Sequence, residues 1–228
     1  MMGRGSKGMN DGLNHAKFKA EQMVIKTNIN RNEYSSEHIL NHIISQSNID
    51  TFNYPFTSDI SGILVSDSRS TTLTINSKMS KGRCNFSKAH ELGHYFLHID
   101  NKSSIISFQD VINKSNYASE EELQCESEAD MFAGHLIIPD FLLIEFLRDG
   151  RSFSSICKQL VISKQALRFR IKEILIYVYH IAYWKAHNIV INFENMHLQA
   201  MTILRNITSN IPASTNNLLG SVQYNFDM

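Results

Sequence analysis

Residues 90–94 read His-Glu-Leu-Gly-His, and no other stretch constrains the fold of this chain as strongly. Residues four apart on an α-helix differ by only about 40° around the axis, so His90 and His94 project from one face. Two imidazoles in this arrangement can hold a zinc ion, while Glu91 on the flank can take a proton from the attacking water. The spacing therefore predicts a Zn²⁺ site, one ion per chain, with Glu91 as the general base.

The neighbours of this motif are mainly apolar, which favours a buried helix. Burying two imidazoles and a carboxylate is costly unless they are paired or bound to a metal. The alternative interpretation is a helix whose polar side chains hydrogen-bond in the core without a metal.

A zinc site needs a third protein ligand, and a catalytic one keeps a fourth position open. The segment 120–139 begins with glutamates, becomes apolar and stops at Pro139, a pattern typical of a helix. Glu126 and Asp130 are one turn apart on it, so Glu126 can ligate zinc while Asp130 accepts a hydrogen bond from a ligand histidine. Without the upstream motif, this acidic run would instead indicate a solvated helix face.

The block from Arg83 to His98, followed by the block from Glu126 to Ala133, resembles the ImmA/IrrE family of zinc metallopeptidases. The resemblance covers about residues 36–175. It implies that Glu126 is the third zinc ligand. It also implies a protein substrate of one kind, a specific helix-turn-helix repressor of a mobile element or stress operon.

Two or three short strands are expected between Ile49 and Asn76, ahead of the motif helix. This order predicts an α+β fold: a compact zincin-like metallopeptidase domain with a small β-sheet, the motif helix and a second ligand-bearing helix, followed by a helical C-terminal part. An edge strand could hold an extended substrate backbone. Residues 100–119 are polar and are interpreted as a surface loop, with a lid over the cleft as the alternative.

Two further histidines are not expected to bind the metal. His98 comes four residues after His94 on the continuing helix, whereas metzincins place their third histidine six residues after the second, beyond a glycine turn. Its expected role is a favourable charge near the helix end. His135 lies about 180° around its helix from Glu126 and should face away from the site.

Residues 153–174 have the pattern of two short helices with a tight turn, and the second helix is basic. DNA reading is the less favoured interpretation, because the family resemblance implies that such helices close the peptidase domain. The net charge of zero also gives no strong electrostatic case for nucleic acid. The expected organisation is an N-terminal extension at 1–34, partly disordered, the metallopeptidase domain at 35–150, helix-turn-helix-like closing helices at 151–176 and a C-terminal extension of unknown role at 177–228 with a flexible end.

Three widely spaced cysteines without a C-x-x-C pair indicate neither a disulfide framework nor a thiolate metal site. The first residues lack the apolar stretch of a signal peptide, and the apolar run 174–184 is too short to span a bilayer. We therefore expect a cytoplasmic zinc endopeptidase without a membrane segment, acting on a regulatory protein. The alternatives are a non-proteolytic repressor-binding module or a DNA-binding regulator with a structural metal.

Overall fold

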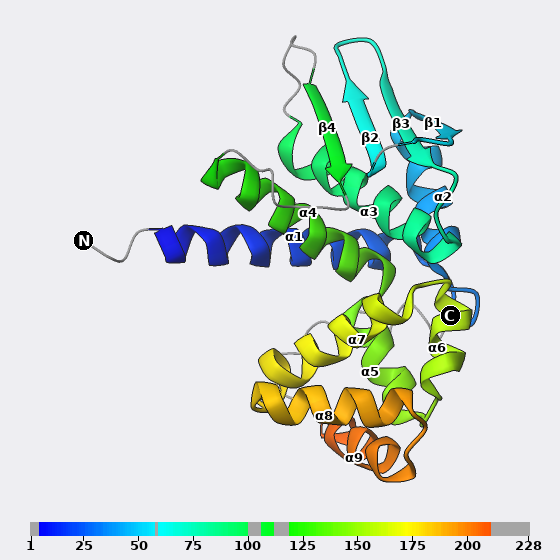
Figure 1. Ribbon diagram of the computed structural model, residues 1–228, viewed down its shortest axis with the longest axis vertical. Helices are drawn as coiled ribbons and strands as arrows, with labels where there is room; N and C mark the ends of the chain where they lie inside the picture. The colour runs from blue at the N-terminus through cyan, green and yellow to red at the C-terminus, as the bar shows by residue number, and fades with distance from the viewer. Residues whose placement is uncertain (1–4, 58, 100–105, 112–118, 211–228) are drawn as a thin grey trace.

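The computed structural model describes residues 5–57, 59–99, 106–111 and 119–210. A small sheet forms the top of the molecule in Figure 1, long helices lie directly beneath it, and a bundle of shorter helices forms the lower part. No helix in the described ranges is long and apolar enough to cross a membrane. The architecture confirms the predicted α+β class and is consistent with a compact zincin-like domain.

The sheet has four strands in the order β1-β3-β2-β4. Their bounds are β1 Ile49–Tyr54, β2 Ile60–Ser66, β3 Thr71–Asn76 and β4 Ile106–Val111. β1 runs parallel to β3, whereas β2 pairs antiparallel with both β3 and β4. Leu64 on β2 and Leu73 on β3 are paired in register and fully buried, so these central strands carry the apolar face that packs on the helices.

Four helices support the sheet: α1 Gly5–Thr27, α2 Ser36–Ser47, α3 Lys81–His98 and α4 Glu120–Ile137. α3 lies immediately under β2 and β3, α4 crosses beside α3, and α1 runs along the far side of α4 (Figure 1). Ser35 caps α2 by accepting a hydrogen bond from the backbone of His38, and Ser119 caps α4 in the same way through Glu122. These caps satisfy N–H groups that have no partner within the helix.

The lower part of the molecule is helical. It comprises α5 Asp140–Arg148, α6 Phe153–Leu160, α7 Lys164–Glu173, the π-helical turn η2 Ile174–Val178, α8 Tyr183–Glu194 and α9 Leu198–Ser209. The two short helices expected within 153–174 are therefore present as α6 and α7. They are joined by a turn at Val161, whose φ of 54° is left-handed.

Several expectations need correction. Within the N-terminal extension, residues 5–12, expected to be disordered, are helical as the start of α1, because α1 packs along α4 and gains stability from that contact. The segment 100–119, interpreted as a loop, contains the edge strand β4, which pairs with β2. Residues 100–105 and 112–118 lie outside the described ranges. In the apolar run 174–184, Leu175 is buried, whereas Tyr177 and Trp184 are largely exposed.

Candidate metal centre

The candidate site lies where α3 and α4 cross. Gly93 on α3 faces Ala129 on α4, and an added Cβ at Gly93 would stand 3.0 Å from the Ala129 Cα and 3.1 Å from its carbonyl oxygen. The missing side chain therefore lets the two backbones approach more closely than any other residue would allow. This close approach brings the motif histidines of α3 within reach of Glu126 on α4.

Three donor atoms converge at this crossing. The Nε2 atoms of His90 and His94 are 3.1 Å apart. The two carboxylate oxygens of Glu126 lie 3.3 Å from the Nε2 of His90 and 3.2 Å from the Nε2 of His94. All three side chains are buried, and they could together hold a metal ion.

The distances among these three side chains fit a zinc ion. A tetrahedral ion with bonds of about 2.0–2.1 Å has ligand-to-ligand edges of about 3.3–3.4 Å. The Nε2–Nε2 distance of 3.1 Å, and the nitrogen–oxygen distances of 3.3 and 3.2 Å to the two different oxygens of Glu126, lie within a few tenths of an ångström of that value. Two nitrogens and a carboxylate are also a donor set that zinc accepts.

The hydrogen bond behind His90 fixes which of its nitrogens faces the centre. The Nδ1 of His90 is 2.9 Å from the Oδ1 of Asp130. Because a carboxylate can only accept, Nδ1 donates and Nε2 keeps its lone pair. Asp130 is thus placed behind a histidine as the sequence predicted, and it comes from the same helix as Glu126.

A second chain of contacts does the same for His94. Its Nδ1 lies 3.1 Å from the Nδ1 of His98, and the Nε2 of His98 lies 3.0 Å from the Oε2 of Glu128. Glu128 accepts a hydrogen bond from the Nε2 of His98, so the Nδ1 of His98 is free to accept one from the Nδ1 of His94. The Nε2 of His94 therefore keeps its lone pair. The expected helix-end role of His98 is therefore replaced by a contact directly behind His94.

Two imidazole lone pairs directed at each other across 3.1 Å repel unless a cation lies between them. Burial favours this neutral state, because it lowers the pKa of His94 from 6.5 to about 4. Neutral imidazoles and an ionised carboxylate are the forms that bind a metal.

Glu91 lies on the flank of the two histidines, against the sheet. Its side chain is fully buried under β2, and a Cβ added at Gly62 would stand 3.0 Å from the Glu91 Oε1 and 3.2 Å from its Cγ. Gly62 therefore leaves the space that the Glu91 carboxylate occupies. On the other side of the site, the ring of Phe108 from β4 stacks on His94 at a centroid distance of 4.2 Å.

The Peptidase_M78 family model, described as the IrrE N-terminal-like domain, matches residues 44–172, which is more than half of the 228 residues. The chain belongs to this family. The match runs from the end of α2 through the sheet and both helices of the metal centre into α7, and it confirms the resemblance to ImmA/IrrE metallopeptidases. No curated protein matches the chain.

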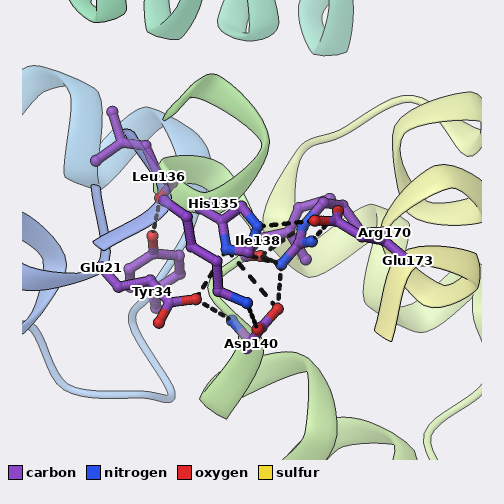
Figure 2. Close-up of polar contacts among 9 residues, drawn as sticks. Glu21, Tyr34, His135, Leu136, Ile138, Asp140, Arg170 and Glu173 are labelled. Carbon is purple, nitrogen blue, oxygen red and sulfur yellow. Dashed lines mark hydrogen bonds and ion pairs between the residues drawn. The ribbon is translucent and has the colours of Figure 1, made fainter. Parts of the chain in front are cut away.

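In this member of the IrrE N-terminal-like family, a second buried group also has metal-ligand chemistry: Glu21, His135 and Asp140 (Figure 2). Two cations already occupy it, because Arg170 and Lys17 both pair with Asp140. The Nη2 of Arg170 is also only 3.2 Å from the Nδ1 of His135. We therefore interpret this group as a charge network. His135 faces away from the metal centre, as predicted.

The network joins helices that are far apart in the sequence (Figure 2). The Nδ1 of His135 on α4 lies 2.8 Å from Glu21 on α1, and its Nε2 lies 3.1 Å from Glu173 on α7. Arg170 donates to the carbonyl of Ile138 and pairs with Glu173. These contacts tie the ligand-bearing helix to both the first helix and the lower bundle. No local sequence pattern indicated this network, because its partners are separated by up to 123 residues.

Three of the four basic residues of α7 pair with carboxylates of the same molecule. Arg170 is buried in the network, and Arg168 and Lys164 both pair with Glu194 on α8. A helix that reads DNA needs its cations directed at phosphates and base edges. This arrangement weakens the case for DNA reading by α7.

Proposed function

We propose that the protein is a zinc-dependent endopeptidase in which His90, His94 and Glu126 hold the ion and Glu91 is the general base. The observation that supports it most is the convergence of three buried metal-binding side chains. The Nδ1 of His90 is hydrogen-bonded to Asp130, and the Nδ1 of His94 to His98. Asp130 orients His90 in this scheme, and membership of a metallopeptidase family agrees with it.

When bound, zinc would supply a Lewis acid for the scissile carbonyl and would ease the ionisation of the attacking water. Glu91 takes the proton of that water and delivers it to the leaving amine. Glu91 is adjacent to the ligand His90 in the chain, and Gly62 leaves the space that its carboxylate occupies under the sheet, so Glu91 is proposed as the base and not as a ligand.

The proposed substrate is a cytoplasmic regulatory protein, in particular a helix-turn-helix repressor of a mobile element or stress operon. This follows from the family resemblance of the two motif blocks. The internal pairing of the α7 cations also favours action on a repressor protein over direct binding to an operator. The proposed organisation keeps residues 35–150 as the peptidase domain and 151–176 as its closing helices.

Co-expression of the protein with its cognate repressor and a reporter tests this function. We expect wild-type protein to cleave the repressor and switch the reporter on, and Glu91→Gln to do neither while it still binds zinc. Asp11→Asn, a change of an exposed carboxylate on α1, is the control and should behave as wild type. Full reporter induction by Glu91→Gln without cleavage would contradict the proposal and support a repressor-binding module.

A further inference from the structure

A cavity of about 750 Å³ lies beside the metal centre, between α3, α4 and α7. Asp130 lines it, and the same carboxylate holds His90 by a 2.9 Å hydrogen bond. One imidazole ring therefore separates the cavity from the donor atoms of the metal centre. Its volume is in the range of ligand-binding sites in proteins and exceeds what a single bound water or ion requires.

Three large apolar side chains from three different helices contribute to this cavity: Phe86 of α3, Met131 of α4 and Phe169 of α7. Phe86 and Met131 are only half-buried, and Phe169 is 61% exposed. The exposure of Phe169 contrasts with Leu167 and Ile171 on the same helix, which are fully buried. Leaving three such side chains partly in water at one place is unfavourable, and it indicates a surface that a partner covers.

The charged groups at the floor of the cavity are already paired with one another. Arg170 donates to the Ile138 carbonyl and pairs with Asp140 and Glu173, and Glu173 also contacts His135 (Figure 2). These contacts leave the floor with little unpaired charge to attract a charged group. They also fix the position of α7, so that Phe169, the neighbour of Arg170, is held at the cavity.

We infer that this cavity receives a large apolar side chain of the protein substrate, next to the peptide bond that is cut, and that Phe86, Met131 and Phe169 set this preference. The inference rests on the proposed function, since it assumes that the substrate is held at the metal centre. A peptide chain advances about 3.3 Å per residue, so a residue beside the scissile bond can reach a cavity that begins at Asp130. In this proposal α7 contacts the substrate and contributes to its specificity.

Isothermal titration of full-length, zinc-loaded protein with two hydroxamates tests the inference. Acetohydroxamate has a zinc-binding group and almost no side chain, whereas a succinyl hydroxamate with an isobutyl group adds a leucine-like side chain. We expect the isobutyl compound to bind wild-type protein at least about 10-fold more tightly, and Phe169→Ala to remove most of that advantage, because apolar pockets discriminate by roughly 10- to 200-fold. Acetohydroxamate should bind both proteins equally.

Tyr177→Ala is the matched control, because Tyr177 is 74% exposed on η2 and does not line the cavity. It should leave both dissociation constants unchanged. If both hydroxamates bind but the isobutyl group gives no advantage, or if Phe169→Ala leaves that advantage intact, the cavity assignment is wrong and the zinc site stands. If neither compound binds zinc-loaded wild-type protein, the proposed function and the cavity assignment both fail.

Discussion

Gly93→Ala tests whether the close approach of α3 and α4 builds the metal centre. The new Cβ would meet the Ala129 Cα at 3.0 Å and its carbonyl oxygen at 3.1 Å, both backbone atoms that cannot rotate away. Ordinary contact begins at 3.4 Å, so α4 must retreat by several tenths of an ångström. Metal sites tolerate departures of only about 0.2 Å in their bond lengths. We therefore expect zinc affinity to fall by about 10- to 100-fold, the loss typical of misplaced ligands.

Global stability should change much less than zinc affinity. Alanine in place of glycine favours a helix by about 1 kcal/mol, which offsets part of the roughly 1–3 kcal/mol cost of overpacking. Competition with a chromophoric zinc chelator measures the affinity, and urea denaturation of the metal-free protein measures the stability. Gly62→Ala is the matched control: it crowds Glu91 and leaves the ligands alone, so zinc should be kept while turnover falls. Wild-type zinc affinity in Gly93→Ala would refute the reasoning.

Three further outcomes follow from the geometry. Asp130→Asn and His98→Ala should each weaken zinc binding by about 10- to 100-fold without removing a ligand, and wild-type affinity in the chelator assay would show that these contacts do not support the site. Arg170→Met should lower the free energy of unfolding by about 3–5 kcal/mol, because it leaves buried carboxylates without their cation, and unchanged urea denaturation would contradict a structural network. Burial raises the pKa of Glu173, but Arg170 and His135 together lower it more, to about 2 from the ordinary 4.5. A lowered folded-state pKa means that this stability is present above about pH 4.5 and is lost as pH falls toward 2, a term of about 3 kcal/mol that Glu173→Gln should abolish in acid-unfolding curves.

The local patterns of the sequence predicted the parts of the site that lie on single helices. The spacing of His90 and His94 set two nitrogens on one face of α3, and the four-residue spacing of Glu126 and Asp130 set one carboxylate toward the centre and one behind His90. The chain order alone placed strands ahead of the motif helix. Whether these side chains bind zinc stays a prediction.

The hydrophobic periodicity of a single helix does not predict which residues of other helices it contacts. His98 was expected to act only at the end of its own helix, and only the crossing of α3 and α4 brings it to 3.0 Å from Glu128. β4 was missed because its short alternation is set among polar residues, and pairing with β2 stabilises it as a strand. The glycine-rich start of α1 predicted disorder from local propensity, and packing on α4 overrides that propensity.

The metal content of the purified protein tests the central claim most directly. Elemental analysis of wild type, Glu126→Ala and Glu91→Gln should give about one zinc per chain in wild type and in Glu91→Gln, and a large loss in Glu126→Ala, because Glu126 supplies one of three proposed ligands and Glu91 supplies none. Wild-type protein that contains no metal and takes up none when zinc is added would contradict the account, and His90, His94 and Glu126 would then be a buried polar cluster of the core.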